Sequence, residues 1–256
     1  MAYARTQGII LRCTDYSESS QVAAVLTPDM GQVHVLAKGS RRPRKDARPP
    51  LTLLTCCDLV IARRAVGQLH ILGEYSLREH FPGVAADLRR LWTAFYGDEL
   101  ILAFTTENAD DGPLYGLFIY FLRRLHRGAD PDPTLFQFLA RALRTLGAMP
   151  LTDHCAQCGG PLHGHTRFSS GAGGVLCGDC SRADTAAFAI SRGSLAVMTR
   201  LAAANGAGEA ALRLTAAQVV EIQRAFAEQI QYHLGRPLRT ERFLVERPEP
   251  QWGASR

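Results

Sequence analysis

The sequence contains no run of eighteen apolar residues, and its opening MAYARTQGIILRC lacks the apolar segment and cleavage site of a signal peptide. No membrane span or secretion signal is therefore expected, and we expect a cytoplasmic protein. Lysine is scarce too, with 2 lysines against 27 arginines. We attribute this bias first to genomic base composition and only second to recognition of phosphate.

Motifs of catalysis are also absent. There is no GxxxxGK[ST] nucleotide loop, and the glycine-rich stretch SGAGG at 170–174 lacks the lysine that such a loop requires. No HExxH or GxSxG motif occurs, and the acidic residues are too scattered to suggest a two-metal nuclease. We therefore expect a protein that binds without turnover, and not an enzyme.

The charge that is present is concentrated in one segment. The chain of 256 residues carries a net charge of +5, and residues 38–48 alone carry six cations against one aspartate, which is also +5. The rest of the chain therefore sums to about zero. With 46% apolar and 21% charged residues, the composition is that of an ordinary globular protein with room for two modest domains.

The hydrophobic pattern predicts an α+β fold. Short alternating runs at 8–13, 20–27, 32–37, 51–62 and 68–77 predict five strands, which suit a small closed barrel. An OB-fold is favoured, and an SH3-like barrel is the alternative. Helical spacing follows over 84–106, 113–127, 133–146, 193–204 and 216–234, the last with a capping box at Thr215 and Gln218.

The predicted domains follow from this change of pattern. Residues 1–81 form the barrel, which would bind DNA, and residues 82–152 with 185–244 form a helical domain. A four-cysteine module is inserted at 153–184, and residues 245–256 form a loose polar tail.

Four of the seven cysteines form two CxxC pairs, Cys155 with Cys158 and Cys177 with Cys180, separated by eighteen residues. Two such turns can offer four thiolates to one tetrahedral ion, so we predict a single structural Zn²⁺. A redox CxxC and an iron–sulfur cluster are the alternatives. The nearby histidines are expected at the surface: His154, His163 and His165. The remaining cysteines are expected as buried strand residues: Cys13, Cys56 and Cys57.

The basic loop between two predicted barrel strands is the candidate DNA contact. Its predicted DNA-binding residues are Lys38, Arg41, Arg42, Arg44, Lys45 and Arg48. If all six neutralised phosphates, the log–log salt slope of binding would be about −4 for single strands and about −5 for duplex. A solvated loop without a partner is the alternative. Aromatic residues that could stack on bases are Tyr3, Tyr16, Tyr75 and Phe81, and further cations lie at 123–127 and 236–242.

These residues resemble the bacterial RecO family of recombination mediators. The likeness comprises GIILR at 8–12, AKGSRR at 37–42, FPG at 81–83, the two CxxC pairs and YHLGRPLRT at 232–240, in order along nearly the whole chain. The resemblance implies an N-terminal OB-fold, a helical domain and a zinc element. It also implies binding to single- and double-stranded DNA and annealing of complementary strands.

The resemblance further implies partners of the recombination machinery. These are RecR and the C-terminal tail of the single-strand-binding protein, with RecA loaded indirectly as a result, and a RecF-like partner is left open. An acidic, apolar-tipped tail needs an apolar groove rimmed by arginine, for which helices over 84–127 are the candidate. A nucleoid-associated location in the cytoplasm is expected.

Two other functional classes share some of these features. A zinc-bearing transcription or RNA-associated OB-fold factor would have a similar barrel and cysteine module. A thiol–disulfide enzyme would have reactive cysteines and no tightly bound metal.

Overall fold

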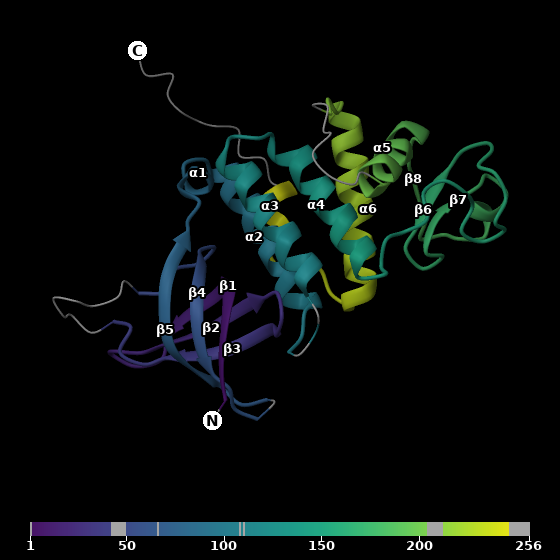
Figure 1. Ribbon diagram of the computed structural model, residues 1–256. Helices are drawn as coiled ribbons and strands as arrows, with labels where there is room; N and C mark the ends of the chain where they lie inside the picture. The colour runs from purple at the N-terminus through teal and green to yellow at the C-terminus, as the bar shows by residue number, and fades with distance from the viewer. Residues whose placement is uncertain are drawn as a thin grey trace, which may run out of the picture.

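The computed structural model describes residues 2–41, 50–65, 67–107, 109, 111–203 and 212–245. A five-stranded barrel lies below a group of helices, and a small cysteine-containing sheet lies at the far side of the helices (Figure 1). Within these residues, no helix is both long enough and apolar enough to cross a membrane. The predicted α+β fold is confirmed.

The barrel has the strand order of an OB-fold. It consists of β1 (Tyr3–Asp15), β2 (Gln21–Thr27), β3 (Gly31–Ala37), β4 (Cys56–Ala62) and β5 (His70–Glu79). The order β1-β2-β3-β5-β4 closes through antiparallel pairing of β1 with β4, and only β3 and β5 run parallel. This Greek-key order excludes the simple meander of an SH3-like barrel and confirms the OB-fold.

The prediction of one strand over 51–62 is wrong, because β4 begins only at Cys56. Leu54 has a positive φ of 56°, which an extended strand does not allow. Instead, residues 50–55 form an irregular segment whose Leu54 N–H donates to the Ile10 carbonyl at 2.8 Å. The Thr55 carbonyl in turn accepts from the Ile10 N–H at 3.0 Å, at the point where the β1–β2 register shifts.

Strand β1 joins two hydrophobic cores because its side chains alternate between two faces. Ile10 is fully buried inside the barrel with Val25 and Ile61. Its neighbours Ile9 and Leu11 point to the other face and pack in the same core as the helices. The apolar run that opens the sequence therefore attaches the helical domain to the barrel wall.

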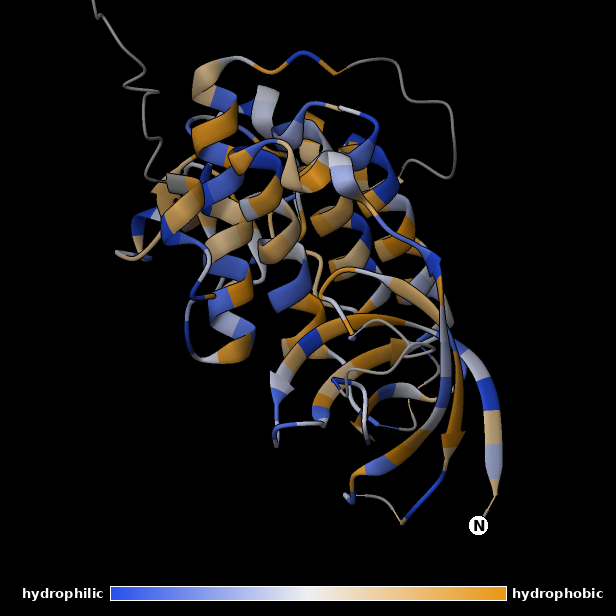
Figure 2. Ribbon diagram, turned by 90° about the vertical axis from the view of Figure 1, so that its left-hand side faces the viewer, coloured by the Kyte–Doolittle hydropathy of each residue, from blue (hydrophilic) through white to orange (hydrophobic). Residues whose placement is uncertain are grey.

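Seven helices are present in the described residues: α1 (Pro82–Ala85), α2 (Leu88–Phe104), α3 (Gly112–His126), α4 (Pro131–Thr145), α5 (Arg192–Ala203), α6 (Ala216–Leu234) and α7 (Arg242–Val245). In Figure 2, hydrophobic positions recur along each long helix between hydrophilic ones, as expected of helices with one face in a shared core. The capping box at Thr215 and Gln218 is confirmed.

The helices differ from the sequence prediction by more than one residue at three points. The predicted helix over 84–106 is two helices, because Asp87 interrupts it and its carboxylate accepts from the Arg90 N–H at 2.8 Å as the N-cap of α2. Helix α4 begins at Pro131 rather than at Pro133, with Asp130 as its N-cap. The short helix α7 was not predicted.

The cysteine module is a three-stranded sheet beside the helices. It contains β6 (Arg167–Ser169), β7 (Gly174–Leu176), β8 (Phe188–Ala189) and the 3-10 helix η1 (Cys180–Arg182), with the strand order β7-β6-β8. Phe168, Val175 and Phe188 are buried in the same core as the helices. The module is thus attached to the helical domain through its own apolar face.

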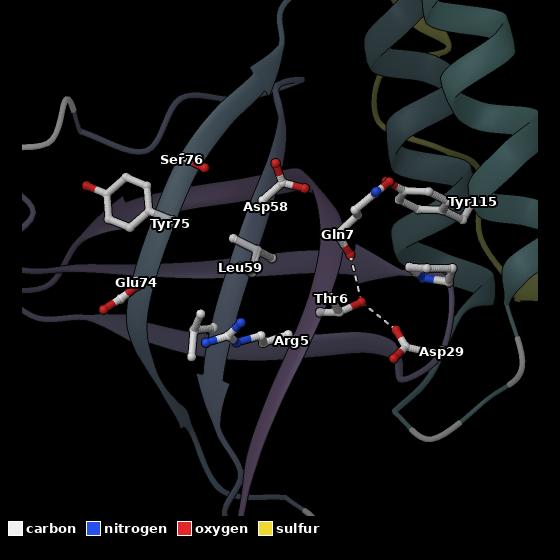
Figure 3. Close-up of a pocket in the computed structure, with 12 residues that line it drawn as sticks. Arg5, Thr6, Gln7, Asp29, Asp58, Leu59, Glu74, Tyr75, Ser76 and Tyr115 are labelled. Carbon is white, nitrogen blue, oxygen red and sulfur yellow. Dashed lines mark hydrogen bonds between the residues drawn. The ribbon is translucent and has the colours of Figure 1, made fainter.

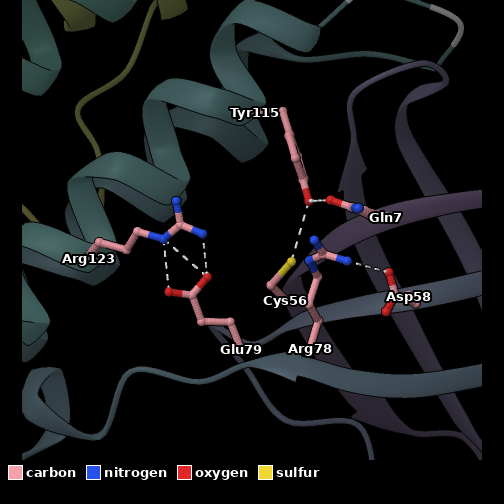
Figure 4. A network of polar contacts seen from close by, with 7 residues as sticks. All are labelled: Gln7, Cys56, Asp58, Arg78, Glu79, Tyr115 and Arg123. Carbon is pink, nitrogen blue, oxygen red and sulfur yellow. Dashed lines mark hydrogen bonds and ion pairs between the residues drawn. The ribbon is translucent and has the colours of Figure 1, made fainter. Parts of the chain in front are cut away.

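Polar contacts also join the barrel to α3 (Figure 4). Arg123 of α3 binds Glu79 of β5 through two nitrogens, with the shortest distance 2.7 Å, and this hydrogen-bonded guanidinium lowers the pKa of Glu79. The Tyr115 hydroxyl lies 3.4 Å from both the Cys56 thiol and the Gln7 side-chain oxygen. These contacts occupy the side of the barrel formed by β1, β4 and β5.

Gly31 lies close against the connection from α2 to α3. It has a φ of 66°, and a Cβ there would collide with the Thr106 carbonyl and lie 2.9 Å from the Ala109 nitrogen. We predict that Gly31→Ala destabilises the protein by about 2–4 kcal/mol, from both left-handed strain and overpacking. Urea unfolding measures the loss.

Gly67 supplies the matched control for this prediction. Its φ of 80° is equally positive, but beyond its chain neighbours a Cβ at that position would meet no atom within 4 Å among the described residues. Gly67→Ala should therefore cost only the conformational strain, about 1–2 kcal/mol. An equal loss of unfolding free energy in the two variants would show that Gly31 is not closely packed against the α2–α3 connection.

Asp98 of α2 is buried among helices, and burial together with the neighbouring Glu99 raises its pKa well above the ordinary value. Because its folded-state pKa is raised, this group destabilises the fold increasingly as pH rises above the ordinary aspartate pKa. We predict that Asp98→Asn is more stable than the parent at neutral pH, because the amide does not have to be kept protonated in the fold.

The advantage of Asp98→Asn should shrink as pH falls toward 4, because the aspartate of the unfolded chain then approaches its own pKa and the free-energy cost of keeping the folded carboxyl protonated falls. Urea unfolding midpoints of the parent and of Asp98→Asn, measured between pH 4 and pH 8, give this stability difference at each pH. Glu18→Gln, at an exposed position of the β1–β2 loop, is the control and should show no such trend. A pH-independent difference would contradict the assignment.

Candidate nucleic-acid interface and metal centre

Both ends of the basic loop are anchored beside the β1–β2 loop. On the N-terminal side, Arg41 forms an ion pair with Asp15 at 2.8 Å and its N–H donates to the Ser19 carbonyl at 3.1 Å. On the C-terminal side, the Leu51 N–H donates to the Gln21 side-chain oxygen at 2.9 Å. Lys38 is exposed. Four predicted contacts lie outside the described residues: Arg42, Arg44, Lys45 and Arg48.

The Arg41–Asp15 pair leaves the arginine accessible, since the two side chains are 39% and 56% exposed. An exposed ion pair of this kind contributes no more than about 1 kcal/mol in water. A phosphate could therefore replace the Asp15 carboxylate as the partner of the Arg41 guanidinium at little cost. Lys38 and Arg41 thus stand at one end of the barrel with their charges available to a polyanion.

The four candidate stacking aromatics differ in exposure and in their position on the barrel. Phe81 is only 6% exposed and packs edge-on against His126, so it is not available to a base. Tyr3 is exposed but pairs with Ala62 at the opposite end of the barrel. Tyr16 is 68% exposed on the β1–β2 loop, next to Asp15. Tyr75 is partly buried on β5.

The secondary basic groups make structural contacts in the described residues. Arg123 binds Glu79 across the junction of α3 with the barrel. Glu99 accepts from the N–H groups of Arg239 and Thr240, both at 2.9 Å, and lies 3.8 Å from the Arg236 guanidinium. The 236–240 segment is thereby fixed to α2. These arginines thus help to hold the elements together.

A hollow of about 950 Å³ on the barrel does not suit nucleic acid. It lies over β1, β4 and β5 beside Tyr115 (Figure 3). Three carboxylates line it, Asp29, Asp58 and Glu74, against a single arginine, Arg5. Phosphates are repelled by such a surface, so the interface is assigned by charge to the barrel end that carries the basic loop, and not by the size of the hollow.

The four cysteines of the two CxxC pairs lie together. The Sγ atoms of Cys155, Cys158, Cys177 and Cys180 are all within 4.8 Å of one another, and the cluster could hold a metal ion. All seven cysteines lie in the described residues, and none of them is in a disulfide. The other three lie in the barrel, where Cys56 and Cys57 are buried as predicted, but Cys13 is only partly so because it stands near the end of β1.

Backbone geometry turns the first pair toward the second. The Gly159 N–H donates to the Cys155 carbonyl at 2.9 Å, and Gly159 has the positive φ of 70° that this tight turn needs. The Cys177 N–H points at the Cys155 sulfur at 3.4 Å. Burial raises the Cys155 pKa, but N–H groups of Cys158, Cys177 and Gln157 outweigh it and lower that pKa to about 6.

This donor set fits a metal that prefers thiolate. Four sulfurs from two CxxC turns, with N–H groups aimed at a sulfur, form the arrangement that tetrahedral Zn²⁺ takes in closed structural sites. His163 and His165 are exposed and His154 is partly exposed, in keeping with the prediction. In the described residues, the four cysteines alone form such a cluster.

Comparison with known proteins covers most of the chain. Residues 1–81 match the family model "Recombination protein O N terminal", and residues 85–242 match "Recombination protein O C terminal". A protein named "DNA repair protein RecO" from Anaeromyxobacter dehalogenans strain 2CP-C is 33% identical over 93% of this chain and 94% of its own length.

Two further relatives carry the same name. The protein from Anaeromyxobacter sp. strain Fw109-5 is 36% identical over 93% of this chain and 94% of its own. That from Symbiobacterium thermophilum is 30% identical over 95% of this chain and 97% of its own. The similarity thus spans barrel, helices and cysteine module together.

Proposed function

Because the chain belongs to the RecO family of DNA repair proteins, we propose that it binds single- and double-stranded DNA and anneals complementary strands. With RecR it would help to load RecA onto strands coated by single-strand-binding protein. It acts without turnover, at the nucleoid. A RecF-like partner is compatible with this role.

The observation that carries the proposal is the anchoring of the basic loop on an OB barrel. OB-folds bind single strands with one face and its flanking loops, and cations along the strand supply most of the affinity. Lys38 and Arg41 stand at the start of this loop on the barrel. Cations that screen two phosphate chains lower their repulsion, so that base pairing can proceed without ATP.

An annealing assay tests this function. Complementary strands coated with the cognate single-strand-binding protein should pair faster when the protein and RecR are added than with either alone. The same assay with RNA strands distinguishes an RNA-associated factor, which would favour RNA over DNA. An unchanged annealing rate with both nucleic acids would refute the proposal.

For the cysteine cluster, the donor set supports one structural Zn²⁺. Cys155, Cys158, Cys177 and Cys180 would hold it, and four thiolates leave no open position for a substrate or water. When bound, the ion stabilises the fold of residues around β6 and β7. It supplies no reactive group.

For the tail of the single-strand-binding protein, the seam between α3 and α4 is the best candidate. Leu117 and Phe121 of α3 and Phe138 of α4 line a hollow there together with Arg124 and Arg141. The hollow is small, about 10 Å³, so a tail would lie across the rim with its carboxylates on the arginines. The seam extends the predicted groove at 84–127 into α4.

A labelled peptide with the acidic, apolar-tipped sequence of that tail tests the seam. Fluorescence titration should give binding that the double variant Arg124→Glu/Arg141→Glu weakens at least tenfold, because charge reversal repels the tail. Arg213→Glu, at an exposed site before α6, is the control. Equal binding by both variants would exclude the seam.

A further inference from the structure

A second, more enclosed pocket of about 300 Å³ lies at the barrel end that carries the basic loop. It is formed between residues 50–57 and the later part of β5, and so brings together two segments that are distant in sequence. Its lining residues are Pro50, Leu51, Thr52, Thr55, Cys57, Tyr75, Ser76, Leu77 and His80. Its volume is at the lower end of the range of small-ligand sites.

The pocket has an apolar floor and a polar rim. Leu51 and Cys57 are 6% and 3% exposed at its base, and Tyr75 lines it as a partly buried ring. Tyr75 projects from β5 (Figure 3) and packs against the barrel core that contains Cys57 and Leu59. Leu77 is 52% exposed, which is a large apolar surface left in water.

The charge of the pocket differs from that of the neighbouring 950 Å³ groove, with which it shares Tyr75 and Ser76 of β5. None of the residues that line the pocket is acidic, whereas three carboxylates line the larger groove. Exposed polar groups at the rim, on Thr52, Ser76 and His80, can donate to or accept from a ligand. The pocket therefore accepts a flat, mostly apolar group with hydrogen-bonding edges.

The position of the pocket, next to the basic loop, indicates that the flat group it accepts belongs to a phosphate-bearing molecule. Pro50 directly follows the basic loop, and Leu51 is tied to Gln21 at the start of β2. Arg41 is anchored to Ser19 in the β1–β2 loop that precedes β2. A ligand in the pocket thus lies at the barrel end where Arg41 is held, so that a phosphate next to the base can reach a cation.

We propose that this pocket holds one unpaired nucleobase of a bound single strand, with Tyr75 and Leu77 against its face and His80 at its edge. The proposal rests on the DNA-binding function above and adds to it a reason for preferring single strands. Bases of a duplex are stacked and paired, so they reach such a pocket only after unstacking. The neighbouring cations, by contrast, bind either form.

Binding of a strand with and without bases tests the pocket. The probes are an oligothymidylate and a chain of equally many abasic nucleotides, followed by fluorescence anisotropy. The full-length protein should prefer the oligothymidylate by about fivefold or more, as one base contact provides. The double variant Leu77→Ala/His80→Ala should lose that preference and keep its affinity for the abasic chain.

Leu53→Ala is the matched control, since Leu53 is a 40% exposed leucine of the same segment that does not line the pocket. It should keep the preference. Equal binding of both probes by the parent protein, or an unchanged preference in the double variant, would overturn the pocket while leaving DNA binding intact. Failure to bind either probe would overturn the proposed function itself.

A 2-aminopurine base in the strand gives a direct signal from the pocket. Its fluorescence should change on binding to the parent protein and to Leu53→Ala, because the base leaves its stacked neighbours for a protein surface. In the Leu77→Ala/His80→Ala variant that change should be lost. An identical change in all three proteins would place the base elsewhere.

Discussion

Replacing Arg41, Arg42 and Arg44 together with alanine is expected to weaken binding to single-stranded DNA by about 100-fold at 0.1 M salt. Each phosphate contact adds about 0.7 to the log–log salt slope for single strands, so three lost contacts lower the slope by about 2. For duplex the slope should fall by nearly 3. Fluorescence anisotropy over a series of salt concentrations measures both quantities.

The control must remove the same charge from another place. Arg182, Arg200 and Arg213 are exposed arginines of the cysteine module and helical domain, and their triple alanine variant also lowers the net charge by three. It should bind DNA nearly as the parent does if the footprint is local. Equal weakening by both triple variants would mean that overall charge, and not the loop, attracts DNA.

Of the three arginines, Arg41 is the one that lies in the described residues. Its ion pair with Asp15 holds it at the barrel, so Asp15→Asn alone should strengthen DNA binding slightly by removing a carboxylate near the phosphates. An opposite result would indicate that Asp15 matters more for orienting Arg41 than for neutralising it.

The features that could be predicted from the sequence depend on local spacing. The two CxxC pairs predicted the four-cysteine cluster, because each pair supplies its own turn and only the meeting of the turns needs the fold. The alternation around Ile10 predicted a strand, and the change to helical spacing after Phe81 predicted the second half. The choice between two barrel types needed the β3–β5 pairing, which no local pattern contains.

The base pocket could not be predicted because a bulge changes the alternation of β5. Ile61 pairs with Leu72, but Val60 pairs with Glu74, so Gly73 is an extra residue in β5. One extra residue exchanges the two faces of a strand, and Tyr75 and Leu77 therefore share the face of Leu59 and Cys57. The one signal in the sequence is the glycine itself, which marks many bulges but identifies none.

The seam between α3 and α4 likewise could not be predicted from the spacing of residues along the sequence. Arg124 and Arg141 are on different helices, and Leu117 and Phe121 have the spacing of ordinary core residues. Only the packing of the two helices places both arginines at the edge of one apolar strip. Helical spacing predicts which residues face a neighbour, but not which neighbour they face.

The second large effect concerns the metal. Cys155 and Cys177 are the buried members of the four-cysteine cluster, and the Cys177 N–H is aimed at the Cys155 sulfur. Structural zinc contributes about 10–16 kcal/mol of apparent binding free energy in isolated zinc-finger peptides. Here Phe168, Val175 and Phe188 also hold the module to the helices, so loss of the ion should unfold the module locally and not the whole chain.

We therefore predict that Cys177→Ser reduces bound zinc from one ion per chain to nearly none and lowers the melting temperature, while DNA affinity at 25 °C stays within about twofold. Elemental analysis, thermal unfolding and hydrogen exchange of residues 153–184 check the three parts. Cys13→Ser, which alters a partly buried thiol of the barrel, should retain the zinc. Visible absorption from bound iron in the parent protein would contradict a zinc site. A full equivalent of zinc in Cys177→Ser would contradict a closed site of four thiolates. A large loss of DNA affinity in that variant would mean that the cysteine module itself contacts the DNA.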